Sequence, residues 1–199
     1  MAQVAHMTRS MSPARLQFAA DDVAQFECWD LPGVVDRWTL ETLARVILLL
    51  HATTSLKPST AQAFVEKGDL RGDLRTRQAV LQSLTLLPSP ERFLWFGQDA
   101  CRSHVPPIFE AIACENRYPA AYFPEFSLNH MILTALFIGI SLTRILDLNH
   151  RITSHVTRVA EAFISERRAA GRPIPERYRQ LLPTISKPSQ DREPAAVLL

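Results

Sequence analysis

Apolar residues recur along this chain mostly at intervals of three and four, and no window shows the sustained alternation of a β-strand. Glycine is scarce, with six residues, and the fourteen prolines stand mostly between apolar segments. We therefore predict an all-α chain, a single domain of antiparallel helices joined by short, proline-containing connections. A solenoid-like stacking of helical pairs stays open, because no fixed repeat period is visible.

The first clear helix is predicted from Thr39 to about His51. Threonine is a favourable N-cap residue, and the residues that follow it return at helical spacing. One set of them is expected to form the face turned towards the core: Leu40, Leu43, Ala44, Ile47, Leu48 and His51.

Capping residues and prolines delimit the segments that follow. The segment 73–87 begins with an aspartate that can cap it, and Ser89 with Pro90 supplies a cap and a first helical residue for the next helix. Two prolines open a predicted helix over 106–114. Residues 118–126 are predicted to form an ordered aromatic loop, because each of their prolines disfavours the α conformation in the residue before it.

Two long helices are predicted in the last third of the chain. Ser127 is expected to cap the most apolar helix, which Gly139 then ends or kinks. Thr153 opens a second helix that ends at Gly171, and a short helix is expected over 175–182. The core-facing residues of the helix after Thr153 are predicted to be Val156, Val159, Ala160, Phe163 and Ile164.

The size of the chain suits one domain with frayed ends. At 199 residues, 47% of them hydrophobic, the chain can bury a sizeable core without disulfides or metal ions. We predict a partly ordered segment at 1–35, a helical domain at 36–182 and a flexible tail at 183–199.

Charge and cysteine content exclude several classes of protein. A net charge of +2, with basic residues spread along the chain, argues against a nucleic-acid partner. Three cysteines (Cys28, Cys101 and Cys114) form no CxxC pair, which argues against a secreted disulfide scaffold and favours a cytoplasmic location. The most apolar window, 128–146, is interrupted by polar residues, so we expect a buried helix and no stable insertion into a membrane.

The familiar motifs for nucleotides, zinc and hydrolytic nucleophiles are absent, so we expect no cofactor and no metal. The cysteines at 101 and 114 are expected to be inert packing residues. The aromatic residues between 93 and 126 suit either the wall of an apolar pocket or a packed core.

Candidate chemistry lies in the polar residues of the block from 101 to 171. His130, at the start of the most apolar helix, can transfer protons near neutrality, although a half-buried histidine hydrogen-bonded to the aromatic loop is the more common case. Glu110 sits among apolar residues and needs a partner, for which Arg102 or Arg117 are the candidates. That pair would either pin a turn between helices or bind a carbonyl or carboxylate.

The candidates form two groups. The catalytic candidates are His130, Glu110 and Tyr118. The candidates for binding a substrate are Asn129, Arg102, His104, Asn116, Arg117, Trp95, Tyr122, Phe126 and Thr134.

Several short motifs of this block occur together in one order: ACR at 100–102, FEAIA at 109–113 followed by Glu115-Asn116, YPA at 118–120, YFP at 122–124, and ER with AAGR at 166–172. With them, the chain resembles the EboA-like domain family of bacterial and fungal secondary-metabolite gene clusters. The resemblance is clear over about 100–175 and looser over about 38–90. It implies an all-helical domain in specialised metabolism, in clusters that handle prenylated, polyketide or cyclitol-type intermediates, and it implies no particular reaction.

Four residues depart from the family pattern, namely His104, Arg117, His130 and Thr134. The departures fall in one block, which is what a pocket re-tuned for its own substrate, or drift on a tolerant surface, would produce.

Two functions follow as hypotheses. The first is a cofactor-independent enzyme that cyclises or isomerises a large apolar natural-product intermediate, a pericyclic Diels–Alder step included, by holding a reactive conformer beside a few hydrogen-bond donors. The second is a non-catalytic helical module that binds or carries a hydrophobic intermediate or docks a partner protein. The expected partner is therefore a small apolar metabolite, and homo-oligomerisation stays open.

Overall fold

The computed structural model describes residues 17–19, 21–23, 37–148, 152–175 and 178. These residues belong to two compact units, one within 1–151 and one within 152–199, and each unit is considered by itself. The predicted all-α class is confirmed, because the regular elements of the described part are α-helices and short 3₁₀-helices. The predicted tail at 183–199 and most of the predicted segment at 1–35 lie outside the described residues.

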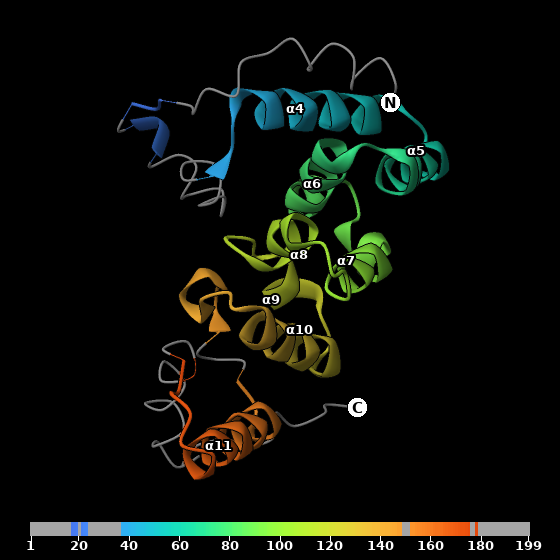
Figure 1. Cartoon of the computed structure of the whole chain (residues 1–199). Helices are drawn as coiled ribbons and strands as arrows, with labels where there is room; N and C mark the ends of the chain where they lie inside the picture. The colour runs from blue at the N-terminus through green and yellow to red at the C-terminus, as the bar shows by residue number, and fades with distance from the viewer. Residues whose placement is uncertain (1–16, 20, 24–36, 149–151, 176–177, 179–199) are drawn as a thin grey trace. The chain divides into compact units, whose positions relative to one another are not determined.

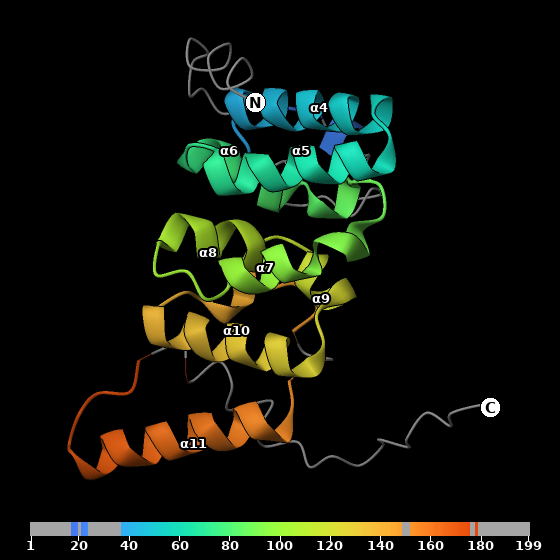
Figure 2. The ribbon, with the colours of Figure 1, turned by 90° about the vertical axis from the view of Figure 1, so that its right-hand side faces the viewer.

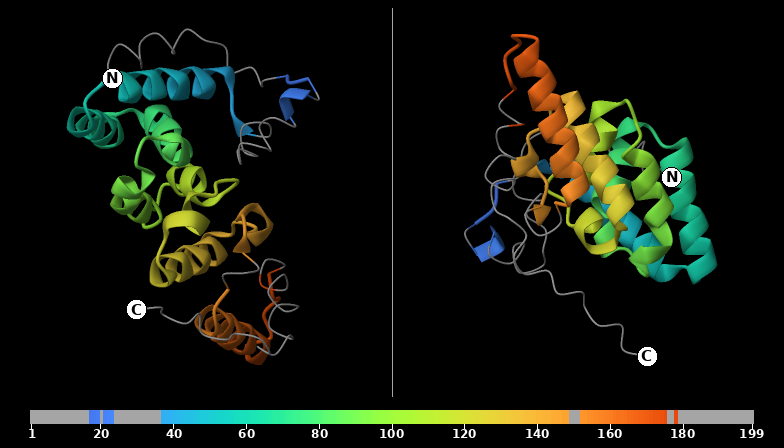
Figure 3. Two further views of the ribbon diagram at one scale, coloured as in Figure 1. Left: turned by 180° about the vertical axis from the view of Figure 1, so that it is seen from behind. Right: turned by 90° about the horizontal axis from the view of Figure 1, so that it is seen from below.

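The helices of the first unit follow one another in successive layers, and helices close in sequence are also close in space. α4 contacts α5 and α6, α6 contacts α8, and α7 contacts both α8 and α9. Figures 1 and 2 show this succession from α4 to α10, and Figure 3 shows it from behind. The elements are α4 (Leu40–Ser55), α5 (Pro58–Arg71), α6 (Leu74–Gln82), η1 (Leu84–Leu86), η2 (Pro90–Phe93), α7 (Leu94–Ala100), α8 (Pro106–Ala113), α9 (Tyr118–Tyr122), α10 (Glu125–Ile138) and η3 (Leu142–Arg144).

Side chains predicted as caps begin two of these helices. The Thr39 hydroxyl accepts a hydrogen bond from the backbone N–H of Thr42, and the Asp73 carboxylate accepts one from Thr76 at 2.8 Å. Each bond satisfies one of the N–H groups that a helix start leaves without an intrahelical acceptor. At the other end, Gly139 terminates α10 with φ 90°, a conformation that glycine adopts without steric cost.

The predicted inward face of α4 is wrong for three of its six residues, whereas Leu43, Ala44 and Leu48 are half-buried. Leu40 and Ile47 are 40% and 55% exposed, and His51 is exposed as well. Apolar residues occur around most of this helix, so their spacing alone could not choose between faces. The choice is made by neighbouring elements, and the residues that α4 buries are Glu41, Arg45, Val46, Leu49 and Thr53.

Other differences concern helix boundaries. α5 was not predicted, because its sequence has little apolar periodicity. Residues 118–126, predicted as a loop, form α9 and the start of α10, with Pro119 and Pro124 at helix starts where the missing N–H of proline costs nothing. Ser127 lies inside α10 instead of capping it, and Ser89 makes no capping hydrogen bond.

Aromatic side chains fill the core where α7 and α9 meet. Tyr118 packs edge-on against Phe123, with ring centroids 6.2 Å apart, and both residues are buried. A methyl group built on Gly97 of α7 would lie 3.0 Å from the Phe123 ring and 3.1 Å from the Tyr118 ring. The close approach between helix and rings therefore favours glycine at this position.

Substitution of Gly97 by alanine tests this packing. Although alanine favours a helix interior by about 1 kcal/mol, the two buried rings would have to shift to admit its methyl group, and overpacking costs about 1–3 kcal/mol. We expect a net loss of about 1 kcal/mol of unfolding free energy in urea denaturation. Gly171→Ala, at φ 63° with no atom near its Cβ, is the matched control for backbone strain without a packing clash. A Gly97→Ala variant more stable than the wild type would contradict the proposed close fit.

The second unit is built on α11 (Ser154–Ala169). As predicted, the Thr153 hydroxyl caps this helix, and Gly171, at φ 63°, follows its end. Of the predicted inward face, the buried residues are Val156, Ala160 and Ile164. Phe163 stacks on Tyr178 with centroids 4.3 Å apart. Of the helix predicted over 175–182, the structure describes residues 175 and 178, and the rest lies outside the described residues.

Candidate functional site

A cavity of about 300 Å³ lies within the first unit, between α6, α8 and the chain segments at 114–117 and 144. Its described lining also includes Trp38, Pro107, Ala111 and Cys114, but most of it is polar. The polar lining residues are Arg37, Gln78, Gln82, Thr85, Glu110, Glu115, Asn116, Arg117 and Arg144. The cavity is therefore suited to a ligand with several hydrogen-bonding groups.

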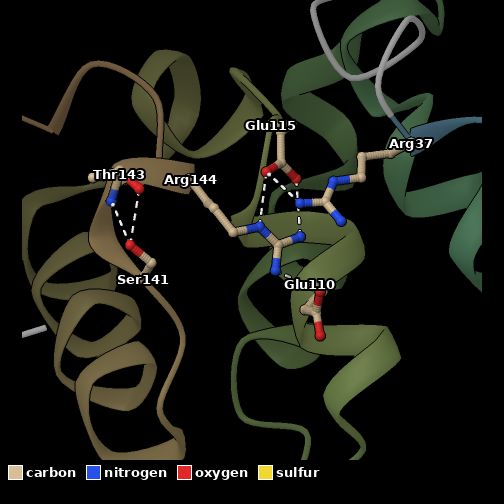
Figure 4. Close-up of polar contacts among 6 residues, drawn as sticks. All are labelled: Arg37, Glu110, Glu115, Ser141, Thr143 and Arg144. Atoms are coloured by element: carbon tan, nitrogen blue, oxygen red, sulfur yellow. Dashed lines mark hydrogen bonds and ion pairs between the residues drawn. The ribbon is translucent and has the colours of Figure 1, made fainter.

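Arg144 organises the charged wall of this cavity. Its Nε and Nη2 donate to the two oxygens of Glu115 at 2.8 and 3.0 Å, and its Nη1 donates to Glu110 Oε2 at 2.7 Å. Figure 4 shows Arg37 reaching Glu115 from the side opposite to Arg144, with its Nη2 3.6 Å from Glu115 Oε1. The two hydrogen bonds to Glu115, and to a smaller extent the one to Glu110, raise the pKa of Arg144 above its ordinary value although burial opposes the shift.

Two hydrogen bonds from backbone N–H groups hold the backbone around this network. Ser141 accepts a hydrogen bond from the N–H of Thr143 and so caps η3, which ends in Arg144 (Figure 4). The N–H of Glu115 donates to the carbonyl of Arg144 at 2.7 Å. Glu115 itself has φ 49°, an uncommon conformation for a residue with a side chain. A strained residue held by two elements is typical of functional sites.

The partner predicted for Glu110 is wrong. Neither Arg102 nor Arg117 binds it, because Arg102 is exposed and Arg117 donates to Asp147 at 3.1 Å. Glu110 is bound instead by Arg144, which lies 34 residues further along the chain. Such a long-range pair cannot be read from local spacing.

Three of the predicted site residues line the cavity, namely Glu110, Asn116 and Arg117. Asn116 holds the fold, since its side chain bonds Leu81, Ala111 and Tyr118. Several predicted residues are exposed and lie outside the lining of this cavity: His130, Arg102, His104, Trp95 and Phe126.

The other predicted residues belong to helix packing. Thr134 bonds the carbonyl of His130 within α10, and Asn129 is buried in the same helix. Tyr122 packs on Tyr118, with ring centroids 4.8 Å apart. Tyr118 is buried and donates its hydroxyl to the carbonyl of Pro90 at 2.7 Å. Burial raises the pKa of Tyr118, so its hydroxyl stays protonated.

The two described cysteines are buried and unpaired by disulfides. Burial raises the pKa of Cys114, which lines the cavity, to about 12, and burial also raises that of Cys101. A thiol with so high a pKa is a poor nucleophile near neutral pH. This agrees with the prediction that both cysteines are packing residues.

Six polar residues of the cavity were missed by the sequence reasoning: Arg37, Gln78, Gln82, Thr85, Glu115 and Arg144. Arg144 gave a signal, because it is the only arginine or lysine in the apolar window 128–146. A charge that interrupts an apolar stretch needs a partner, and that requirement pointed to an ion pair.

A second cavity, of about 350 Å³, lies between the end of α4, the start of α5 and residues 88–93, and its lining is mainly apolar. It contains none of the predicted site residues. In the described part of the chain, no three His, Cys, Asp or Glu side chains gather as a metal site would require. No helix of that part combines the length and apolar content needed to cross a bilayer.

The family of the chain is shown by its match to a known protein-family model. The family model described as "Metabolite traffic protein EboA" matches residues 1–182. The chain belongs to the EboA family. The match extends beyond the block of motifs at 100–175 and confirms the resemblance on which that block was interpreted. No curated protein and no solved structure matches this EboA-family chain.

Proposed function

We propose that this EboA-family chain binds a small polar metabolite in the cavity around Glu110, Glu115 and Arg144 and hands it on unchanged. The observation that carries the proposal is the polar lining of the cavity, with charged groups of both signs held in fixed positions. The family description as a metabolite traffic protein supports a role in moving a metabolite.

The ligand we propose is smaller and more polar than the apolar intermediate expected from the sequence. Small-molecule sites commonly measure about 300–1,000 Å³, so a cavity of about 300 Å³ suits a small molecule or the polar end of a larger one. Of the aromatic residues expected to wall an apolar pocket, Phe96, Tyr118 and Phe123 are buried in the core and line neither cavity, whereas Phe93 is buried and lines the second cavity. Packed rings of this kind leave the polar cavity as the better candidate.

A reaction in the same cavity is the second candidate. Glu110 keeps about 38% of its side chain exposed, and only its Oε2 is bound by Arg144. The free oxygen could act as a base in a cyclisation or isomerisation, while Arg144 polarises a carbonyl. In this version, Glu110 keeps the catalytic role predicted for it, whereas a pericyclic step would use the cavity only to hold the reactive conformer.

The proposal is tested by incubating the full chain with a small-molecule extract of the producing cells, then measuring retained compounds by native mass spectrometry. We expect one low-mass compound to be retained by the wild type and its retention to fall at least about tenfold in Arg144→Gln, since a charged hydrogen bond is worth about 1.5–3 kcal/mol. Arg158→Gln, an exposed change in the second unit, is the control and should retain the compound.

The fate of the retained compound separates the two candidates. Release of an unchanged compound supports binding and transfer, whereas a product of altered structure, with Glu110→Gln slowing its formation, supports catalysis. Equal retention by the wild type and Arg144→Gln would overturn both, provided that circular dichroism shows both proteins folded.

A further inference from the structure

We propose that the ligand of this cavity is a zwitterion, a small metabolite whose carboxylate binds Arg37 and whose amino group binds Glu110. This inference rests on the proposed function and names the chemical class of its ligand. Three observations on the described residues carry it.

The first observation is the spare hydrogen-bonding capacity of Arg37. Half of its side chain is exposed, and its ion pair with Glu115 is long, at 3.6 Å. The Glu115 oxygen in that pair already accepts a hydrogen bond from Arg144 at 2.8 Å. A guanidinium group has five N–H donors in a planar fork that matches a carboxylate. Arg37 is therefore the cation with donors left for an incoming carboxylate.

The second observation is a pair of acceptors that lack donors. Glu110 Oε2 is bound by Arg144, but within the described residues Glu110 Oε1 accepts no hydrogen bond. Gln82 Oε1 is buried and has no hydrogen-bond partner there either. Buried polar atoms are nearly always satisfied in proteins, so an unsatisfied one beside a cavity calls for a donor from elsewhere. An ammonium group brings three donors and a charge that suits Glu110.

The third observation is the balance of charge. The described lining holds the cations Arg37, Arg117 and Arg144 and the anions Glu110 and Glu115, and Asp147 supplies a third anion by binding Arg117. Three charges of each sign leave no net charge. A purely anionic or cationic ligand would introduce an uncompensated charge, whereas a zwitterion would not.

A neutral polyol would also preserve this balance, but its contacts would be weaker. Hydrogen bonds between neutral groups contribute about 0.5–1.5 kcal/mol, and those to charged groups contribute about 1.5–3 kcal/mol. A guanidinium with donors left on one side and an unbound carboxylate oxygen on the other favour a ligand that is charged at both ends. The observations therefore favour a zwitterion over a polyol.

The test compares four matched kinds of probe by ligand-observed NMR on the full chain. The probes are unbranched ω-amino acids of two to six carbons, the carboxylic acids and the primary amines of the same lengths, and myo-inositol. We expect one ω-amino acid to bind at least about tenfold more tightly than its matched acid and amine, because each of these lacks one charged contact. Its length then reports the separation of the two binding groups.

Variants assign the two ends of the probe. Arg37→Gln should weaken the best ω-amino acid and its matched acid about tenfold but should not weaken the amine. Glu110→Gln should weaken the ω-amino acid and the amine but should not weaken the acid. Arg158→Gln, in the second unit, should alter none of the affinities.

Two results overturn the proposal. One is myo-inositol binding as tightly as every ω-amino acid, and the other is an ω-amino acid whose affinity neither Arg37→Gln nor Glu110→Gln reduces. If no ω-amino acid binds while the cellular compound is still retained in an Arg144-dependent manner, the zwitterion is wrong and the proposed function stands. If the cellular compound is not retained either, the proposed function fails.

Discussion

The Glu41→Ala variant is expected to lose about 3–5 kcal/mol of unfolding free energy, the largest effect of any single change proposed for this chain. Glu41 and Arg45 are buried neighbours on α4, with Glu41 Oε1 2.6 Å from Arg45 Nη1, and Arg75 of α6 also binds Glu41. The Nε and Nη2 of Arg45 reach no hydrogen-bond acceptor in the described part of the chain. Removing Glu41 would therefore leave a buried guanidinium without its counter-charge.

Urea denaturation followed by circular dichroism measures this loss. Replacing both Glu41 and Arg45 by methionine removes both charges at similar volume, and that double variant should stay within about 1 kcal/mol of the wild type or exceed it. Arg75→Gln should cost less than about 1 kcal/mol, because 60% of the Arg75 side chain is exposed and its ion pair is screened by solvent. If Glu41→Ala were no worse than Arg75→Gln, the buried pair would not have the role we assign to it.

The ends of the helices could be predicted from the sequence, whereas the buried face of α4 could not. Thr39, Asp73, Gly139 and Thr153 act at helix ends through bonds within a few residues, so their sequence context is sufficient. The face that a helix buries depends on its neighbours in space. On α4, a buried charged pair takes the place that an apolar stripe would otherwise occupy.

The same contrast between local and long-range contacts holds for the candidate site. The sequence identified Glu110 as an acid that needs a partner, which is correct, but the partner lies 34 residues away in η3. His130 was selected because imidazole is chemically versatile, yet its side chain is exposed on α10. Chemical character is readable from residue type, whereas convergence on one cavity is a property of the folded chain.

The four residues that depart from the family pattern have different structural surroundings. His104 and His130 are exposed, and Thr134 is bonded within its own helix. Of the four departures, Arg117 lines the polar cavity. Under the proposed function, a change of ligand would therefore act most directly at Arg117, whereas the other three positions lie outside this cavity.

Asn116→Ala is expected to lose about 3 kcal/mol of unfolding free energy, because three buried hydrogen bonds disappear together. The Asn116 side-chain nitrogen donates to the carbonyl of Leu81 at 3.1 Å and to that of Ala111 at 3.0 Å. Its oxygen accepts from the N–H of Tyr118 at 2.9 Å. One side chain thus joins α6, α8 and α9, and alanine would leave their backbone groups buried without partners.

Chemical denaturation of the Asn116→Ala and Gln98→Ala variants compares their losses of unfolding free energy. Gln98 forms one partly buried hydrogen bond to Ser127, at 2.8 Å, so its removal should cost about 1 kcal/mol or less. Asn116→Asp keeps the acceptor for Tyr118 but turns a carboxylate towards two carbonyl oxygens, and it should be at least as unstable as the alanine variant. An Asn116→Ala protein as stable as Gln98→Ala, yet unable to retain the cellular compound, would show Asn116 to be a ligand contact instead of the joint between three helices.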